Sequence, residues 1–141
     1  ARKIAQWNGR PTTNSYEPGT DDLAGLADDI VMAYLANYRL VAGLSEQYGF
    51  DFYFIWQPYL ITYTEELSPE QLLLVQGFPV AYSQFFRHIY WQVEEKSADY
   101  PLLYYRANAL LLLPENVWID PQHLNPTGNE QMTEVILQVI R

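Results

Sequence analysis

Gly49 separates two sequence patterns that together form one structural unit in α/β proteins. Before it, apolar residues recur at steps of three and four from about Asp22 to Tyr48, which predicts a long amphipathic helix. After it, residues 50–58 read Phe-Asp-Phe-Tyr-Phe-Ile-Trp-Gln-Pro, a β-rich aromatic run that ends at a proline. A helix, a glycine and an apolar strand form the second half of a βαβ unit. We therefore expect a parallel strand that is buried on both faces.

The remaining chain predicts more helix than strand. Ser68 can cap a short helix that begins at Pro69, and a second helix is expected over about 80–96. Residues 102–112 predict either a helix or a buried segment, because periodicity alone does not distinguish the two. A short apolar strand is expected over 117–119, directly before a polar loop.

A last helix follows this loop, and two residues compete for its start. Asn125 can cap it with Pro126 as the first helical residue, or Thr127 and Glu130 can form a capping box. Both alternatives place residues 118–125 on the loop between an apolar strand end and a helix.

Composition excludes several classes of protein. The 141 residues suit one small domain, and a hydrophobic fraction of 49% is enough for a real core. A net charge of −9 argues against nucleic acid as a partner, because phosphate binding needs clustered Lys and Arg. The absence of cysteine excludes disulfides and thiolate metal sites. No apolar run approaches the roughly 18 residues of a membrane span.

The start of the chain predicts neither a targeting signal nor a compact element. Residues 1–20 are rich in turn-forming residues and are expected to form an irregular loop. The chain begins with Ala1 rather than Met, so we expect it to start in the middle of a protein. The sequence gives no compartment, and it calls for no cofactor and no metal, because His88 and His123 have no ligand spacing between them.

Asp120 and His123 are the candidate catalytic residues. The apolar segment 117–119 delivers the aspartate, and the histidine follows three residues later on the same loop. A carboxylate this close can accept a hydrogen bond from the imidazole Nδ1–H, which leaves Nε2 free as a base. Loops at the carboxyl ends of strands are where open α/β sheets hold ligands.

The segment around this pair resembles the last block of the SGNH hydrolases, the GDSL-type esterases and lipases. In that family an Asp-x-x-His-Leu-x-x-x-Gly-Asn pattern opens the terminal helix, and it matches Asp120, His123, Leu124, Gly128 and Asn129. The resemblance implies a serine esterase that hydrolyses acyl or acetyl esters, in which His123 is the general base and Asp120 orients it.

More of the chain is similar to the same family. A long helix with a Tyr-x-x-x-apolar pattern over 34–44 precedes a strand that ends at Trp-Gln-Pro, 56–58, and a variable helical insertion corresponds to 60–115. The resemblance therefore covers about 22–141. It implies an α/β, flavodoxin-like three-layer fold of which only the C-terminal part is present. Gln57, at its strand end, and Asn125, in the loop of the catalytic pair, are the candidate substrate-binding residues.

The family's Gly-Asp-Ser block and its oxyanion blocks have no counterpart in this sequence. None of its serines has the strand–Ser–helix setting of a nucleophile: Ser15, Ser45, Ser68, Ser83 and Ser97. The resemblance therefore implies that the nucleophile lies in a missing N-terminal half or a companion chain, and that the substrate is an acyl or carbohydrate acetyl ester.

Two other interpretations stay open. In one, the chain is a non-catalytic binding or structural subunit that completes its sheet with a partner chain. In the other, it is an independent helical domain in which Asp120 and His123 form an ordinary surface pair. Tyr63, Trp91 and Trp118 either wall a pocket for the substrate or pack in the core.

Overall fold

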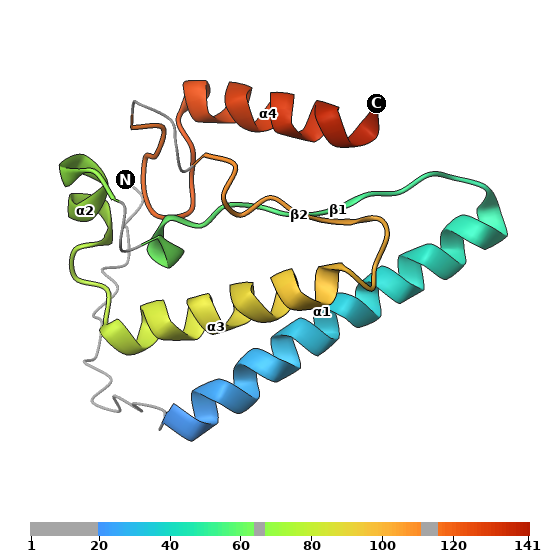
Figure 1. Ribbon diagram of the computed structural model, residues 1–141, viewed down its shortest axis with the longest axis horizontal. Coiled ribbons are helices and arrows are strands. Elements are labelled where there is room, and N and C mark those ends of the chain that lie inside the picture. The colour runs from blue at the N-terminus through green and yellow to red at the C-terminus, as the bar shows by residue number, and fades with distance from the viewer. Residues whose placement is uncertain (1–19, 64–66, 111–115) are drawn as a thin grey trace, which may run out of the picture.

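The computed structural model describes residues 20–63, 67–110 and 116–141. The irregular loop expected over 1–20 lies outside this part, except for Thr20, which begins the first helix. The described residues form helices and two short strands, in this order (Figure 1): α1 Thr20–Tyr48, β1 Phe54–Trp56, the 3₁₀-helix η1 Leu60–Thr62, α2 Pro69–Val75, α3 Val80–Ser97, β2 Leu103–Tyr105 and α4 Pro126–Ile140.

The predicted flavodoxin-like three-layer α/β fold is wrong. The described part is mostly helical, and its sheet consists of β1 and β2 alone, paired in parallel from Phe54 opposite Leu103 to Trp56 opposite Tyr105. The predicted strand over 117–119 does not join this sheet, because Trp118 instead forms an antiparallel bridge with Leu124. Helices α1 and α3 lie on one side of the strands and α4 on the other (Figure 1).

The predicted parallel strand exists, but it is shorter and more open than expected. Only three residues of the 50–58 run form β1, and all three are half-buried rather than buried on both faces. A strand buried on both sides needs further strands and covering helices. Among the described residues, β2 is the sole neighbour of β1, so the outer edge of β1 stays unpaired.

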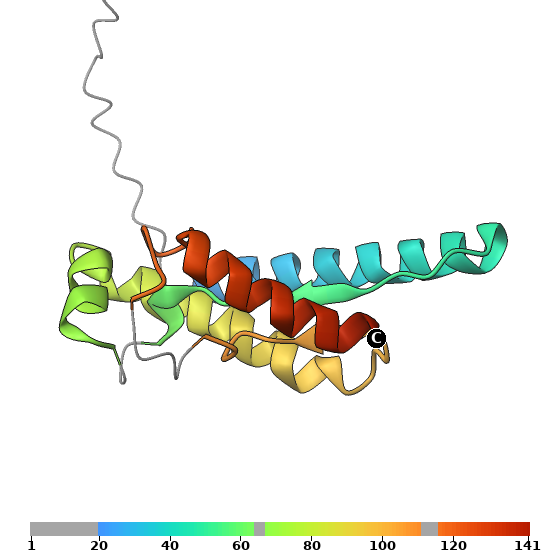
Figure 2. The ribbon, with the colours of Figure 1, turned by 90° about the horizontal axis from the view of Figure 1, so that it is seen from above.

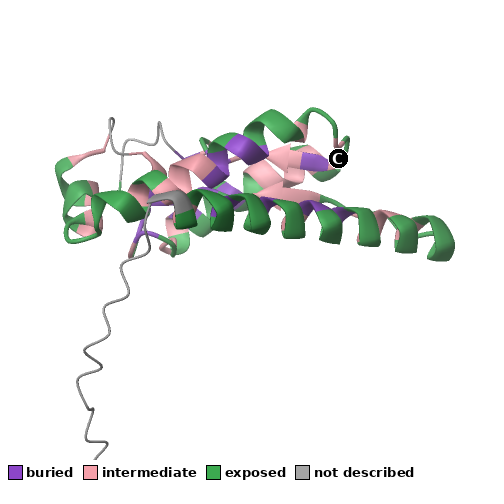
Figure 3. Cartoon of the chain, turned by 90° about the horizontal axis from the view of Figure 1, so that it is seen from below, coloured by how far each residue is buried: buried purple, intermediate pink, exposed green. Residues whose placement is uncertain are grey.

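Helix α1 confirms the prediction from periodicity, and it ends where expected. Gly49 adopts a left-handed φ of 69°, and its N–H donates to the carbonyl of Ser45 at 2.8 Å. The chain reverses there, so that the end of α1 and the returning segment project beyond the other helices (Figures 1 and 2). Most of α1 is exposed (Figure 3), and its buried side chains form one stripe between Ala27 and Tyr38.

The main core lies where α1 and α3 pack together beneath the strands. Val31 and Leu35 from α1 meet Ile89 and Val93 from α3, and all four side chains are buried. The buried Gln92 of α3 ties the two helices together by a polar contact: its Nε2 donates to Asp28 Oδ1 at 2.6 Å, and it also lies 2.9 Å from His88 Nε2.

A second, smaller core supports the loop before α4. Leu60, Leu110, Val117 and Trp118 are buried in it, and Leu124 packs against them. The short helix α2 stands beside this core and has the predicted capping box: the Ser68 hydroxyl accepts from the N–H of the third helical residue, whose side chain accepts from Ser68 N–H in return. No helix in the ranges 20–63, 67–110 and 116–141 is both long and apolar enough to cross a bilayer.

Candidate functional site

Asp120 organises a tight turn through one carboxylate oxygen. Its Oδ1 accepts hydrogen bonds from the backbone N–H of Gln122 at 2.8 Å and of His123 at 2.9 Å. The turn is fastened to the start of η1, because the N–H of Leu60 donates to the carbonyl of the buried Pro121 at 2.9 Å. These backbone hydrogen bonds position the Asp120 carboxylate independently of the His123 imidazole.

The other carboxylate oxygen contacts the imidazole. Asp120 Oδ2 lies 2.7 Å from His123 Nδ1, so the hydrogen bond expected from the sequence is present. An ionised carboxylate can only accept, which places a proton on Nδ1 and leaves Nε2 with a lone pair. Within the described part of the chain, Nε2 has no hydrogen-bond partner. Since 71% of the His123 side chain is exposed, Nε2 is open to a reacting group.

The surroundings of Asp120 favour its anionic form. The N–H of Gln122, and next the imidazole of His123, lower the pKa of the Asp120 carboxyl below its ordinary value of 3.8. An aspartate that stays ionised at neutral pH can hold the imidazole in one orientation and stabilise its protonated form. The catalytic roles of both residues stay predictions.

Asn125 serves as the cap of α4, which resolves the choice left open by the sequence. Its Oδ1 accepts from the N–H of Gly128 at 2.9 Å, and its Nδ2 donates to the carbonyl of Asn116 at 3.0 Å. Both ends of the amide are therefore engaged in holding the loop, and Asn125 does not line the cavity beside His123. Its predicted contact with substrate stays a prediction.

Backbone pairing and a close helix approach hold the loop against α4. Ile119 N–H donates to the carbonyl of His123 at 2.8 Å, and Asn125 N–H donates to the carbonyl of Val117 at 2.9 Å. Gly128, in the first turn of α4, approaches so closely that a Cβ there would lie 2.6 Å from Val117 O. The glycine thus lets α4 sit directly on the segment that leads into Asp120 and His123.

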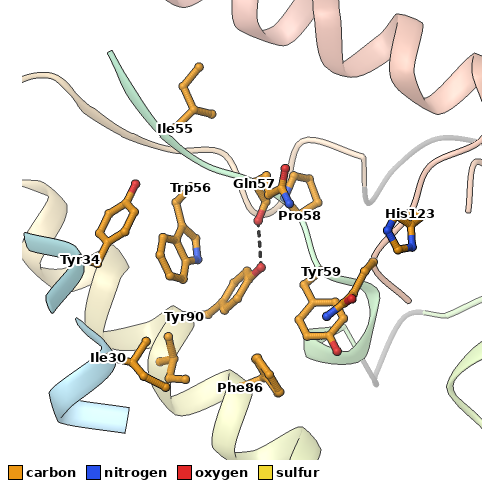
Figure 4. A pocket seen from close by; sticks show the side chains of 12 residues that line it. Ile30, Tyr34, Ile55, Trp56, Gln57, Pro58, Tyr59, Phe86, Tyr90 and His123 are labelled. Atoms are coloured by element: carbon orange, nitrogen blue, oxygen red, sulfur yellow. Dashed lines mark hydrogen bonds between the residues drawn. The ribbon is translucent and has the colours of Figure 1, made fainter. Parts of the chain in front are cut away.

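A cavity of about 540 Å³ lies beside His123. It opens between α1, the end of β1, α3 and the loop before α4, and aromatic side chains gather around it (Figure 4). Gln57 lines this cavity together with Gln122 and His123, so the structure brings Gln57 and His123 to one site. The aromatic walls come from five residues: Tyr34, Trp56, Tyr59, Phe86 and Tyr90.

Sequence reasoning missed these aromatic residues and proposed others. Trp118 is buried in the second core, whereas Trp91 is half-exposed and stacks on His88. Tyr63 and Trp91 line a separate small cavity of about 160 Å³. Two features of the sequence could have indicated residues that line the cavity: Trp56 directly precedes Gln57, and Phe86 and Tyr90 are one helical turn apart on α3.

No hydroxyl lining this cavity is suited to be the nucleophile. Among the described residues, no serine lines it: Ser45 lies in α1, Ser68 caps α2, and Ser83 and Ser97 lie in α3. Ser15 lies outside the described residues. The hydroxyls present are phenols. Burial raises the pKa of Tyr34 to about 12, and it also raises the pKa values of Tyr59 and Tyr90.

The same part of the chain gathers no three His, Asp or Glu side chains into a cluster that could hold a metal ion. The acid–base pair therefore stands beside an apolar cavity without a metal cluster and without a serine among the residues described. What the arrangement offers chemically is one imidazole nitrogen that can accept a proton at the edge of a binding cavity.

No family model matches this chain, and neither the curated proteins nor the solved structures give a match to it. The resemblance to the SGNH hydrolases therefore depends on the residues of the chain alone, chiefly those between 120 and 129.

Proposed function

We propose that this chain supplies the histidine–aspartate acid–base pair of an ester hydrolase whose nucleophilic hydroxyl comes from a segment outside the described residues. One observation carries the proposal. A carboxylate with a lowered pKa holds His123 Nδ1 at 2.7 Å, and the opposite nitrogen is free beside a cavity.

In the proposed reaction, His123 Nε2 takes the proton of the hydroxyl as its oxygen attacks the ester carbonyl carbon. The carbon–oxygen double bond opens to an oxyanion. When it re-forms, the alcohol leaves with the proton that the imidazolium returns to it. Water then repeats the sequence and releases the acid. Asp120 keeps its charge throughout and stabilises the imidazolium between the two transfers.

The residues that resemble the SGNH block support this proposal, because each has a task in holding the pair. Leu124 packs against the second core, and Gly128 permits the close approach of α4. Asn129 Nδ2 donates to the carbonyl of Leu124 at 3.3 Å, which ties the helix to the residue after His123. A random Asp-x-x-His pair would not need these neighbours.

The two histidines of the chain offer a matched test with an activated ester. With 4-nitrophenyl acetate, we expect the protein to accelerate hydrolysis weakly over buffer, by general-base or direct attack through the exposed imidazole. His123→Gln should remove most of this acceleration, and Asp120→Asn should reduce it severalfold. His88→Gln is the control, because His88 lies in α3 away from this cavity and contacts Gln92. An unchanged rate in His123→Gln would contradict the proposal.

A fluorophosphonate probe tests the location of the nucleophile. The chain alone should remain unlabelled, because no described serine lines the cavity beside Nε2. A longer chain or complex that contains the nucleophile should react, and His123→Gln in that assembly should abolish the reaction. Labelling of a serine or tyrosine in the chain alone would show that the nucleophile is not supplied from elsewhere.

A second function is favoured by a specific observation, the open surface of α1. Leu26, Ile30, Leu40 and Leu44 are 37 to 63% exposed, and the outer edge of β1 faces no strand in the described residues. We propose as the alternative that the chain is a non-catalytic subunit that packs this surface against a partner chain. Leu40→Glu with Leu44→Glu should then abolish assembly measured by sedimentation, whereas His123→Gln should change neither assembly nor function.

A further inference from the structure

The cavity beside His123 is a built site for one class of ligand. We infer that it binds a neutral aromatic acyl group that carries an oxygen substituent, so that the substrates are esters of oxygen-substituted aromatic acids. The ester part of this inference rests on the proposed function. The binding part depends only on the walls of the cavity.

The walls are aromatic rings that already pack edge to face. The Tyr34 and Trp56 ring centres are 4.7 Å apart at an interplanar angle of 83°, and those of Trp56 and Tyr90 are 5.3 Å apart at 70°. Tyr59 and Phe86 pack in the same manner at 4.8 Å and 89°. A planar guest ring can extend this pattern, because aromatic pairs prefer edge-to-face or offset contacts.

Among the described residues that line the cavity, the His123 imidazole is the only side chain of the Lys, Arg, His, Asp and Glu types. No Lys, Arg, Asp or Glu lines it among the described residues, and the uncharged polar groups are Gln57, Gln122, the phenols and one indole. A charged acid would lose its hydration there without a counterion, and a sugar would find few of the hydrogen-bond partners that its hydroxyls need. A neutral ring fits best, and about 540 Å³ lies within the range of small-ligand sites.

One buried donor specifies the oxygen substituent. Trp56 Nε1 is buried, and it has no hydrogen-bond partner among the described residues. Figure 4 shows the indole of Trp56 between Tyr34 and Tyr90, with its nitrogen on the side of Tyr90. The Tyr90 hydroxyl is not its acceptor either: that hydroxyl donates to the carbonyl of Gln57 at 2.9 Å, and the described residues leave the indole N–H without a partner. An unpaired buried N–H is costly, so a ligand oxygen that accepts from it is favoured.

Two neutral esters that differ by one oxygen test the inference. Methyl 4-hydroxycinnamate and methyl cinnamate are titrated into the full chain, and binding is followed by NMR at the tryptophan indole N–H signals. We expect the hydroxylated ester to bind about 3- to 10-fold more tightly, as one neutral hydrogen bond allows. It alone should shift the Trp56 N–H signal downfield. Trp56→Phe, which keeps a ring but removes the donor, should reduce the difference to less than twofold.

The controls separate this inference from the proposed function. Binding is measured on intact esters, so it is independent of turnover, and His88→Gln, which lies outside this cavity, should leave the affinities within twofold. If Trp56→Phe does not fold, the shift of the Trp56 indole N–H in the unmodified protein still shows whether the substituent oxygen of the ester accepts from it. Trp91→Phe is used to assign the spectrum. Equal affinities for the two esters, tighter binding of methyl hexanoate or methyl glucoside, or a shift confined to another tryptophan would each overturn the inference.

Discussion

Substitution of Gly128 by alanine tests how the site loop is held. Gly128 lies in the first turn of α4, where a Cβ would lie 2.6 Å from Val117 O and 3.0 Å from the Cβ atoms of Val117 and Leu124. The nearest of these atoms belongs to the backbone, so it cannot move aside as a side chain would. The same carbonyl accepts the N–H of Asn125 at 2.9 Å, so displacing it also disturbs the start of α4.

The magnitude follows from two opposing terms. Forcing a methyl group into a packed site costs about 1–3 kcal/mol. Replacing glycine by alanine inside a helix returns about 1 kcal/mol. The net expectation for Gly128→Ala is a loss of roughly 0–2 kcal/mol in the free energy of unfolding, together with a shift of the His123 imidazole resonances.

Gly43→Ala in α1 is the matched control, because nothing lies within 4 Å of a Cβ at that helical position. We expect it to raise the free energy of unfolding by roughly 0.5–1 kcal/mol. Both variants are compared in urea titrations followed by circular dichroism at the helix signal. If Gly128→Ala were as stabilising as Gly43→Ala, the close approach of α4 to Val117 would be wrong.

Three further results are expected. Asn125→Ala removes the cap of α4 and should lower the free energy of unfolding in urea by about 1 kcal/mol, whereas Asn125→Asp should keep most of it; equal losses would argue against capping. Gln92→Ala removes the amide donor of the exposed Asp28 carboxylate and should cost about 0.5–1.5 kcal/mol, the net worth of one hydrogen bond, which Asp28→Asn should not match; no loss would refute the polar tie between α1 and α3. The Asp120 pKa is lowered from 3.8 in the folded state, so its contribution to stability is present above that value and lost as the pH falls through the lowered pKa. Carboxyl ¹³C NMR measures this titration, and a midpoint at or above 3.8 would contradict it.

The local elements were predictable from the sequence, because local interactions determine them. The helix that ends at Gly49 and the capping box at Ser68 depend on residues within four positions of each other. The fold class was not predictable in the same way. A strand needs neighbours, and the aromatic run after Gly49 finds one partner of three residues in the described chain. Trp118, in the strand predicted over 117–119, instead pairs with Leu124 across its own loop.

The candidate site likewise has a part that local sequence determines and a part that depends on tertiary packing. The Asp120–His123 contact was predictable, since the two residues are three positions apart and the turn between them is short. The cavity was not, because its walls come from α1, β1 and α3, which the sequence does not place relative to one another. In the sequence, Trp56 looks like any core residue of an apolar strand. Only the folded chain shows that its indole N–H lacks a partner, which is the reason for proposing that it binds a ligand.

The tautomer of the His123 imidazole tests the central claim most directly. Long-range ¹H–¹⁵N NMR of the neutral ring should find the proton on Nδ1 and a bare Nε2, and Asp120→Ala should move the proton toward Nε2. Two results would contradict the assignment of His123 as a base. One is a neutral imidazole that carries its proton on Nε2 in the unmodified chain. The other is a tautomer that stays the same in Asp120→Ala.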